Sequence, residues 1–363
     1  MRAAVLYAFN EPFKVEKVEL QEPRQGEVMV KLAASGVCHS DLSIQRGILP
    51  MAPPIIIGHE GAGVIEAVGP GVTSVKKGDH VVLTWLYSCG LCRDCARGKP
   101  HLCDTAAQAV MMGGMYDGTT RFKVGGNDMR HWVGSFAEYT VLPEQAVVSI
   151  RKDVPLESAC LVGCGVLTGA GAALNTAKVE PGDHVAIFGC GGVGLNVIQA
   201  AALAGAEKII AVDLVDRKLE MAKAFGATHV VNSKQGDPAD QIRGLTGGKG
   251  VDYAFEVIGN TNVIQQAFQA VRRGGKLVIV GVPPMGADVS FPAVVFPLEE
   301  KGILGSYYGS PRFRYDIPRL LDLYMAKKFK LDELVSRKLP LDKIQTAMEL
   351  MEQGEVARSV VVY

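Results

Sequence analysis

The sequence has no excess of charge of either sign and no long apolar run. Lysine and arginine together number 38, as do aspartate and glutamate, so the formal net charge is zero at pH 7. Proteins that bind nucleic acid usually carry a basic excess, so this balance argues against a nucleic-acid partner. No stretch of about 18 apolar residues free of charges and breakers is present, so no membrane partner is expected.

Signals for export and for disulfide formation are also scarce. Residues 1–5 read as the start of a strand, without the basic region and apolar run of a signal peptide. This predicts a cytoplasmic protein. The chain has only eight cysteines, and in a chain of this size without an export signal cysteines are more often metal ligands or catalytic groups than disulfides.

Apolar residues make up 48% of the chain, which is enough to bury more than one core. Residues 1–150 show short apolar runs separated by Gly and Pro, a pattern typical of strands. Within them, 104–135 reads as a loop without a clear period, and a loop that long is unusual unless it is functional or carries small elements of its own. From about residue 166 strand-like and helix-like segments alternate, which is typical of a doubly wound parallel sheet. The sequence therefore predicts an α/β protein with a mostly-β part and a doubly wound part.

A glycine-rich motif opens the second part. Residues 189–194 match G-x-G-x-x-G, follow an apolar strand at 185–188 and open a helix, which is the context a dinucleotide fingerprint requires. Its glycines permit a tight turn and the close approach of a pyrophosphate to helix-start amides. Asp213 ends the next strand, where a carboxylate binds a ribose 2′-OH and repels a 2′-phosphate. This favours NAD over NADP, although Arg217 and Lys218, placed to bind the adenosine ribose, weaken that exclusion. The alternative is a structural turn with a helix-capping aspartate.

Four cysteines fall within 15 residues with the spacing C-x2-C-x2-C-x7-C: Cys89, Cys92, Cys95 and Cys103. Four thiolates close the tetrahedral shell of a zinc ion, which makes such a site structural. The metal then stabilises a loop that is too short to form its own core. An iron–sulfur cluster is the alternative that four cysteines can also hold. The spacing favours a structural zinc.

A second set of metal-ligating residues is dispersed. Cys38 lies in Gly36-Val37-Cys38-His39-Ser40-Asp41, His59 in Gly58-His59-Glu60, and Cys164 between two glycines. Each residue taken singly is weak evidence for a metal site, because a lone cysteine is usually a small core residue. Together they supply the two thiolates and one imidazole of a catalytic zinc with an open fourth position. Their separation means that composition alone does not show that they meet.

These motifs occur together in the zinc-containing alcohol dehydrogenases of the medium-chain dehydrogenase/reductase superfamily, which the chain resembles over essentially its whole length. Gly58-His59-Glu60-x2-Gly63-x5-Gly69-x2-Val72 resembles the family's zinc signature. Residues 89–103 resemble its structural zinc lobe, and 162–169 its third-ligand segment. The nucleotide fingerprint matches as well.

The resemblance implies a fold and two zinc ions per subunit. It implies a GroES-like catalytic domain at 1–165 and 309–363 with the structural zinc lobe, and an NAD-binding Rossmann domain at 166–308. The catalytic zinc is expected on Cys38, His59 and Cys164. Glu60 is implied as the acid that approaches the metal, Asp41 as the acceptor that orients His59, and Ser40 as the start of a proton relay.

The resemblance also implies which residues surround the cofactor and the substrate. His39 and Arg358 are expected at the pyrophosphate and Thr168 beside the nicotinamide. The other expected cofactor residues are Gly189, Gly191, Gly192, Val193, Gly194, Asp213, Lys218 and Val257. Trp85 and Leu49 are expected in the substrate pocket, with Met111 or Met115 as further candidates. Cys160 and Cys190 are expected to be small buried residues without a role in the chemistry.

The resemblance implies reversible hydride transfer between an alcohol and NAD, giving an aldehyde or ketone. A large aromatic residue at Trp85 favours primary alcohols, as in alcohol dehydrogenases of class EC 1.1.1.1. Two departures from the family matter. Ser43 stands where many relatives carry a relay histidine, and the apolar segment 47–51 argues against a glutathione adduct as the main substrate. A homodimer or homotetramer is expected.

Three alternatives stay open from the sequence. The same scaffold serves polyol or secondary-alcohol dehydrogenases. It also serves nicotinoproteins, which keep NAD bound through turnover. More remotely, the cysteine cluster suits a zinc module without enzymatic activity, against which the balanced charge and the second metal set argue.

Overall fold

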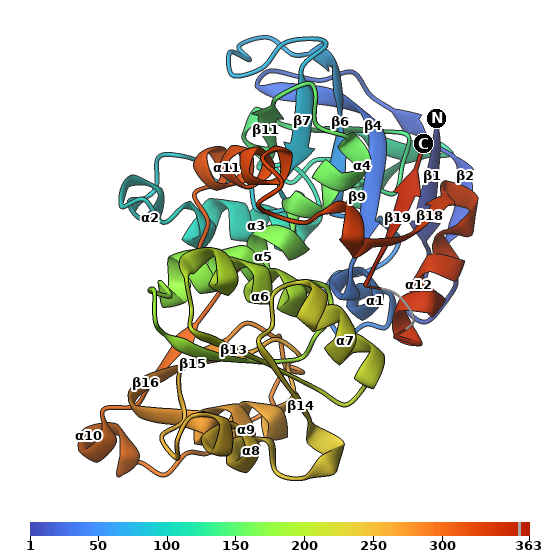
Figure 1. Ribbon diagram of the computed structural model, residues 1–363. Coiled ribbons are helices and arrows are strands. Elements are labelled where there is room, and N and C mark those ends of the chain that lie inside the picture. The colour runs from blue at the N-terminus through green and yellow to red at the C-terminus, as the bar shows by residue number, and fades with distance from the viewer. Residues whose placement is uncertain (355–356) are drawn as a thin grey trace. The chain divides into compact units, whose positions relative to one another are not determined.

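The computed structural model describes residues 1–354 and 357–363, which form two compact units (Figure 1). The first unit comprises Met1–Gly165, Arg312–Lys327 and Leu331–Tyr363. The second comprises Val166–Pro311 and Lys328–Lys330. The first unit is thus assembled from segments that are far apart in the sequence.

The larger sheet of the first unit has seven strands. They are β4 (Glu27–Val37), β6 (Glu60–Val68), β7 (His80–Leu83), β10 (Tyr139–Pro143), β11 (Val147–Ile150), β18 (Val335–Pro340) and β19 (Arg358–Val362). Their order is β11-β7-β6-β4-β19-β18, with β10 also paired to β4. The antiparallel pair of β4 and β6 runs through its centre and sets Gly36 opposite Glu60. The C-terminal strand β19 pairs with β4, which brings Ser359 opposite Val37.

The second sheet of the first unit has six short strands. They are β1 (Arg2–Leu6), β2 (Lys14–Lys17), β3 (Glu19–Leu20), β5 (Ile55–Ile56), β8 (Phe122–Val124) and β9 (Asn127–His131), in the order β2-β1-β5-β9-β8-β3. Apolar side chains such as Val5, Ile56, Phe122 and Ala137 form a buried cluster on it. The mostly-β first unit agrees with the sequence pattern.

The segment 104–135 contains more structure than the loop predicted from the sequence. It holds helix α3 (Asp104–Met112), and β8 and β9 form a hairpin across Gly125 and Gly126, which both have positive φ. The pairing of β9 with β5 is between distant segments, and strands of three to five residues are too short to show a local period. The segment is therefore a long connection that carries small elements of its own, one of the two cases that its length left open.

Short helices complete the first unit. They are α1 (His39–Gln45), α2 (Arg93–Ala96), α3, α4 (Leu156–Ala159), α11 (Phe313–Met325) and α12 (Ile344–Glu352). Short 3-10 turns stand at Pro100–Leu102, Glu144–Ala146, Cys160–Gly163, Asp332–Leu334 and Leu341–Lys343. Helix α1 begins directly after β4, because the carboxylate of Asp41 accepts a hydrogen bond from the backbone N–H of Cys38 at 3.0 Å and caps the first turn.

The second unit is built on one sheet of six parallel strands. They are β12 (His184–Phe188), β13 (Lys208–Asp213), β14 (His229–Asn232), β15 (Val251–Glu256), β16 (Val271–Ile279) and β17 (Gly302–Gly305). Their order is β14-β13-β12-β15-β16-β17. The chain moves outward from β12 to β14 and then returns to β15 beside β12, so the strand order reverses between β12 and β15. This confirms the predicted doubly wound sheet.

Helices precede and connect these strands. They are α5 (Gly165–Gly171), α6 (Gly192–Ala204), α7 (Asp216–Ala224), α8 (Pro238–Leu245), α9 (Thr261–Ala270) and α10 (Val295–Glu299), with a π-helical turn at Ala172–Ala177 and a 3-10 turn at Ser233–Gln235. In Figure 1, α8 and α9 lie on one face of the sheet and α5 and α6 on the other. Asp237 caps α8 ahead of Pro238, and Gly205 ends α6 in the left-handed conformation.

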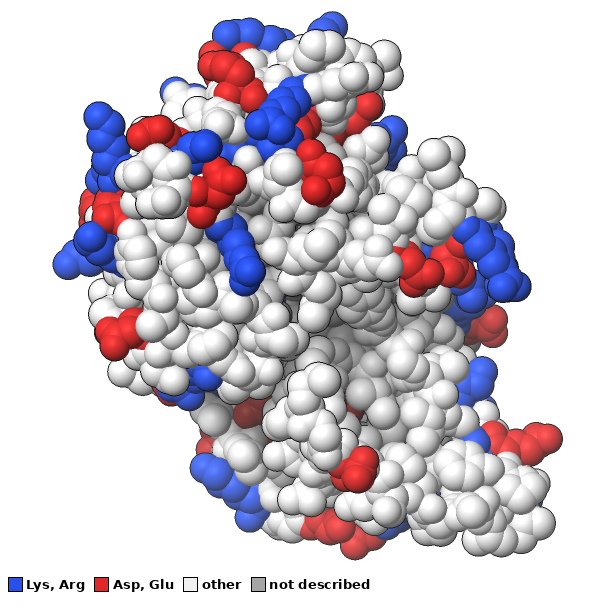
Figure 2. All heavy atoms as spheres, turned by 180° about the vertical axis from the view of Figure 1, so that it is seen from behind, with Lys and Arg blue, Asp and Glu red and all other residues white. Residues whose placement is uncertain are grey.

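Charges of both signs are mixed on the surface. On the face drawn in Figure 2, Lys and Arg side chains lie among Asp and Glu side chains, and neither sign forms a patch of its own. In the described part of the chain no single helix is long and apolar enough to cross a membrane. One bent pair of helices, Leu156–Gly163 with Gly165–Ala177, passes that test by length and composition alone.

Candidate functional site

Three separate segments of the first unit bring metal-ligating side chains together. Cys38 follows β4 and starts α1, His59 precedes β6, and Cys164 precedes α5. Because β4 and β6 are antiparallel neighbours, the end of β4 and the start of β6 lie at the same edge of the sheet. The ligand atoms of Cys38, His59, Glu60 and Cys164 all lie within 4.8 Å of one another, and all four residues are buried. The fold thus brings together the ligands whose proximity the sequence alone did not show.

Glycines beside the ligands make this convergence possible. Gly58 has a φ of +91°, and a Cβ there would lie 2.6 Å from the backbone nitrogen of Phe136. A Cβ on Gly163 would lie 2.6 Å from the carbonyl oxygen of Leu83, and one on Gly165 would lie 1.8 Å from Nη2 of Arg358. Side chains at these positions would displace His59 and Cys164 from the cluster.

Asp41 connects two of the ligands. One oxygen, Oδ2, accepts the hydrogen bond from the backbone N–H of Cys38, and the other, Oδ1, lies 2.9 Å from Nδ1 of His59. Both side chains of this Asp41–His59 pair are fully buried. A carboxylate behind a histidine fixes its tautomer and leaves Nε2 to face a metal.

The residues present fit a zinc ion. In the part of the chain that the structure describes, the buried Nε2 of His59 has no hydrogen-bond partner. A hydrogen bond from Cys164 and the charge of Arg358 hold the pKa of the Cys38 thiol well below its usual range, despite burial. Burial lowers the pKa of His59, but Asp41 and Cys38 outweigh it and raise that pKa to about 10. The cluster therefore stabilises positive charge, and two thiols with one imidazole are a donor set typical of catalytic zinc.

Glu60 and Arg358 lie behind the ligands. Oε1 of Glu60 accepts a hydrogen bond from the N–H of Gly165 at 2.9 Å and lies 3.6 Å from Nη2 of Arg358. Burial raises the pKa of Glu60 to about 7, and Arg358 opposes that rise. Both side chains are buried, with Arg358 only 6% exposed. The guanidinium expected at a pyrophosphate is thus paired with a carboxylate, and its contact with the cofactor stays a prediction.

Trp132 is a site residue that the sequence analysis missed. Its indole is stacked on the imidazole of His59, with the ring centroids 4.2 Å apart and the planes 25° apart. It also meets Trp85 edge to face, with centroids 5.8 Å apart. The backbone N–H of Trp132 donates to the carbonyl oxygen of Ile56 at 2.9 Å, next to the β5–β9 pairing. The available signal in the sequence is a tryptophan directly after a histidine, His131, in a segment without a clear period.

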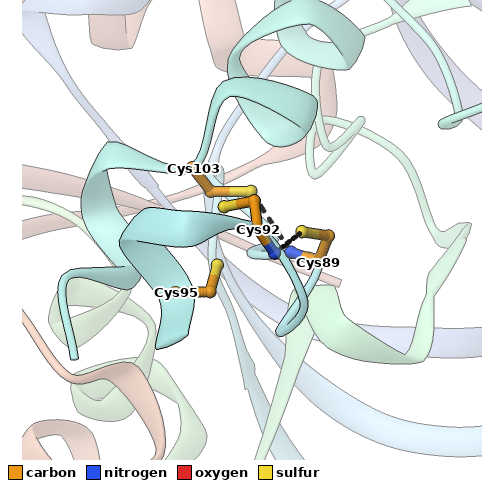
Figure 3. A group of neighbouring side chains, drawn as sticks. All are labelled: Cys89, Cys92, Cys95 and Cys103. Carbon is orange, nitrogen blue, oxygen red and sulfur yellow. Dashed lines mark hydrogen bonds between the residues drawn. The ribbon is translucent and has the colours of Figure 1, made fainter. Parts of the chain in front are cut away.

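The four cysteines of the second cluster also converge. Their sulfur atoms point toward one another (Figure 3) and lie within 4.8 Å of one another. Backbone N–H groups of Cys89 and Cys92 donate to the sulfurs of Cys103 and Cys89, each at 3.3 Å. Burial raises the pKa of Cys89, but backbone N–H groups of Leu91 and Cys92 outweigh it and lower that pKa to about 6. Burial raises the pKa of the Cys95 and Cys103 thiols, so Cys89 is the cysteine whose thiolate these N–H groups stabilise. Four convergent thiols are the donor set of a structural zinc.

The glycine fingerprint stands at the carboxyl edge of the parallel sheet. Gly189 has a φ of +103°, and a Cβ on Gly194 would lie 1.9 Å from its carbonyl oxygen, so the turn from β12 into α6 requires both glycines. Asp213 ends the neighbouring strand β13, and its Oδ2 accepts a hydrogen bond from the N–H of Cys190 at 2.9 Å. Its Oδ1 accepts from Leu214 and Val215, at 2.8 and 3.1 Å. The tight turn and the adjacent acid fit a dinucleotide.

The remaining expected residues are placed in the two units as follows. In the first unit His39 is exposed, Ser40, Leu49 and Trp85 are partly buried, Met111 is exposed and Met115 is buried. In the second unit Thr168, Gly191, Gly192, Val193, Lys218 and Val257 are partly buried. Cys160 and Cys190 are buried, as expected.

Two family models match the chain. The model described as "Alcohol dehydrogenase GroES-like domain" matches residues 24–152. The model described as "Zinc-binding dehydrogenase" matches residues 192–326. Together they match part of each unit.

Curated relatives and solved structures match over the whole length. An S-(hydroxymethyl)glutathione dehydrogenase of Paracoccus denitrificans is 43% identical over 100% of this chain and 99% of the relative. An NDMA-dependent alcohol dehydrogenase of Amycolatopsis methanolica is 42% identical over 100% of this chain and 98% of the relative. The crystal structure of a benzyl alcohol dehydrogenase from Acinetobacter calcoaceticus superposes with a TM-score of 0.95 at 37% identity, covering 99% of this chain and 98% of that one.

Proposed function

Because the chain belongs to the zinc-binding alcohol dehydrogenases of the medium-chain dehydrogenase/reductase superfamily, we propose that it oxidises primary alcohols with NAD and catalyses the reverse reduction. The observation that carries the proposal is the buried convergence of Cys38, His59 and Cys164, with Nε2 of His59 left without a partner in the described chain. We assign the chemistry to the first unit and nucleotide binding to the second.

Two groups would complete the site. Bound at Cys38, His59 and Cys164, zinc supplies Lewis acidity toward an alcohol hydroxyl, and bound NAD accepts the hydride. Asp41 holds the His59 ring through the 2.9 Å hydrogen bond. Oε2 of Glu60 is buried and makes no hydrogen bond to a described residue, and Glu60 is proposed to approach the metal when a ligand departs.

Ser40 is the proposed proton acceptor. It stands in the first turn of α1, and its Oγ lies 3.9 Å from Sγ of Cys38. A hydroxyl at this position accepts the proton of the substrate hydroxyl and passes it outward. Ser43, one turn further along α1, does not titrate near neutral pH, so we propose that the proton leaves through the cofactor ribose hydroxyl and water.

The cofactor is proposed to bind along the carboxyl edge of the sheet in the second unit. Gly189, Gly191, Gly192, Val193 and Gly194 form the turn and the start of α6, where helix-start amides favour phosphate. Asp213 is proposed to bind the adenosine ribose together with Lys218, and thereby to select NAD. Thr168, Val257, His39 and Arg358 are proposed as further cofactor contacts.

The substrate class is proposed from the side chains beside the metal ligands. Trp85 meets Trp132 edge to face, and Trp132 covers His59, so bulky aromatic surface stands next to the cluster. These bulky side chains favour primary alcohols, in which the carbon that bears the hydroxyl carries only one carbon substituent. Leu49 adds an apolar surface in the segment after α1. The relative named as a benzyl alcohol dehydrogenase makes aromatic primary alcohols the first substrates to test.

S-(hydroxymethyl)glutathione is the second candidate substrate. The relative with that named activity is 43% identical over the whole chain. The apolar residues 47–51 argue the other way, because a charged glutathione adduct gains little from apolar side chains. The two candidates differ in charge, so a direct comparison separates them.

The test is NADH formation from NAD by the purified zinc-loaded protein, with benzyl alcohol, aliphatic primary alcohols, polyols, secondary alcohols and S-(hydroxymethyl)glutathione supplied separately. We expect the primary alcohols to give the highest kcat/KM and a strong chelator to abolish turnover. Cys38→Ala should be inactive, whereas Cys160→Ala, which changes a buried cysteine outside both clusters, should stay active. Chelator-resistant turnover, or equal activity in the two variants, would contradict the proposal.

Two related alternatives are tested alongside. A protein that keeps its NAD bound would show nicotinamide absorbance after purification, and NDMA is a second oxidant to supply, given the name of one relative. We also propose a homodimer or homotetramer, which light scattering distinguishes by mass.

A further inference from the structure

Glu256 is a buried carboxylate that neither the sequence motifs nor the proposed chemistry uses. It is the last residue of β15, and its side chain is fully buried. Strand β15 neighbours β12, with Glu256 opposite Phe188. The strand order reverses between these two strands, and in doubly wound sheets the ligand crevice lies beyond the carboxyl ends at such a reversal. Glu256 therefore stands at the inner end of the expected dinucleotide crevice.

One carboxyl oxygen of Glu256 accepts hydrogen bonds from the backbone of the following loop. Oε1 accepts hydrogen bonds from the N–H groups of Ile258, Gly259 and Asn260, at 2.9, 2.8 and 3.3 Å. Three successive amides that converge on one carboxyl oxygen constrain the conformation of this loop. Asn260 in turn caps α9 by accepting from Asn262 and Val263.

The backbone oxygen of the same residue holds a second loop. The carbonyl of Glu256 accepts hydrogen bonds from the N–H groups of Val280 and Gly281, at 2.9 and 3.0 Å. These two residues follow β16. A Cβ on Gly281 would lie 2.1 Å from the backbone nitrogen of Gly259, so the two loops are in direct contact. Glu256 thus receives five N–H groups from the loops after β15 and β16.

The first of these loops packs on the nucleotide fingerprint. A Cβ on Gly189 would lie 2.7 Å from Ile258 and 3.1 Å from Val257, and one on Gly194 would lie 3.3 Å from Val257. Ile258 is nonetheless 54% exposed. The side chains that the Glu256 carboxylate positions therefore line the glycine turn on one side and are open to a ligand on the other.

We propose that Glu256 is a positioning residue for the nicotinamide half of the dinucleotide, acting through the loops 257–260 and 280–282. The inference rests on the proposed NAD dependence. Asp213, which is proposed to bind the adenosine ribose, ends β13 on one side of the reversal, whereas β15 and β16 lie on the other. A dinucleotide that crosses the reversal places its second half over the loops that Glu256 holds.

Oε2 of Glu256 is buried and has no hydrogen-bond partner in residues 1–354 and 357–363. Burial raises the pKa of this carboxyl, and the three N–H groups oppose the rise. The loop geometry needs an acceptor at Oε1 but nothing that the structure describes at Oε2. A glutamine can therefore replace the glutamate with little loss, whereas an alanine cannot.

The experiment measures binding of NADH and of AMP, the adenosine half alone, by isothermal titration calorimetry. For Glu256→Ala we expect the Kd for NADH to rise by about tenfold or more, as loss of a buried acceptor implies. The Kd for AMP should stay within about twofold. Glu256→Gln should restore most of the NADH affinity. Glu207→Ala, at the amino edge of the same sheet, is the matched control and should bind both ligands normally.

Hydrogen exchange supplies a readout that needs no ligand. The amides of Ile258, Gly259 and Asn260 should exchange faster in Glu256→Ala, with the amides of β12 and β13 unchanged. If Glu256→Ala does not fold, Glu256→Asp, which withdraws the acceptor by one methylene, should show the same selective loss of NADH affinity. Equal losses for NADH and AMP, or unchanged binding of both, would overturn the inference. Failure of the wild-type protein to bind NADH would instead refute the proposed function.

Discussion

The indole of Trp132 covers one face of the His59 imidazole at a centroid separation of 4.2 Å, while the carboxylate of Asp41 holds the edge of the ring at 2.9 Å. The imidazole is thus fixed both in its plane and about its axis. Two residues that bind no metal themselves decide where Nε2 of His59 points.

Replacing Trp132 with Leu should weaken metal binding at this site. An aromatic contact of this kind contributes about 0.5–1.5 kcal/mol, so we expect the zinc Kd to rise by roughly two- to tenfold. The cobalt-substituted protein should show altered visible absorption, because the ligand field changes. Trp132→Phe keeps a stacked ring and should resemble the wild type. Identical cobalt spectra for the Leu variant and the wild type would remove this role.

Replacing Asp41 with Ala should cost more, because it removes the partner of His59 and the cap of α1 together. Loss of a carboxylate behind a metal-binding histidine typically lowers metal affinity or activity by about 10- to 100-fold. Competition with a colorimetric chelator measures the affinity. Asp41→Asn keeps an oxygen acceptor and should fall between the two, and an Ala variant with wild-type affinity would exclude the expected orienting role.

The second cluster should hold its metal independently of the first. Replacing Cys103 with Ser should lower the zinc content of the purified protein from two ions per subunit to one, which elemental analysis measures. The lobe at 89–103 should then become more susceptible to proteolysis, because the metal replaces a core there. Catalytic zinc should remain, as its ligands lie on other segments. A Cys103 variant that still carries two ions would contradict the structural assignment.

Asp213 should control the choice between NAD and NADP. Asp213→Gly removes a carboxylate that repels a 2′-phosphate, so the ratio of kcat/KM for NAD to that for NADP should fall by at least about tenfold, the effect of roughly one hydrogen bond or charge contact. The same substitution removes the acceptor for Cys190 and Leu214, so thermal stability must be followed in parallel. An unchanged ratio would place the selectivity elsewhere.

His131 should make the protein less stable in acid. Burial, with the charge of Arg121 in support, lowers the pKa of His131 to about 4, whereas an unfolded histidine titrates near 6.5. The unfolded state therefore binds a proton first, and stability falls as the pH drops from about 6.5 toward 4. At pH 5 the loss amounts to about 2 kcal/mol.

The comparison is with His131→Gln, which does not titrate. Urea midpoints for the two proteins should diverge in their pH dependence below about pH 6.5, with the wild type losing stability more steeply. Acid also removes zinc from both proteins, so only the difference between them is informative. Parallel curves would mean that His131 does not titrate in this window.

The sequence predicts best those sites whose residues all lie within one short segment. The cysteine spacing at 89–103 and the turn at 189–194 each specify one short segment, so their geometry followed from the residues in order. The set of Cys38, His59 and Cys164 depends on the pairing of β4 with β6 and on three glycines. Spacing alone says nothing about distant segments, so this ligand set is indicated only by the resemblance to a family.

Residues that act through contacts with distant segments are not evident from the sequence. Trp132 lies after β9, which pairs with β8 in a local hairpin and with β5 more than seventy residues away in sequence. A strand this short shows no clear local period. Glu256 is one glutamate in a strand of otherwise mostly apolar residues, and only its buried environment distinguishes it. Both residues are defined by contacts with other segments, which a single sequence does not display.

The edge-to-face contact between Trp85 and Trp132 has an optical consequence, because these are the chain's only two tryptophans. All indole emission of the protein therefore originates at one place, beside the His59 ring. Intrinsic fluorescence is in effect a built-in probe of the catalytic cluster and carries no tryptophan signal from the second unit. Replacing one indole at a time would show which of the two senses metal loading.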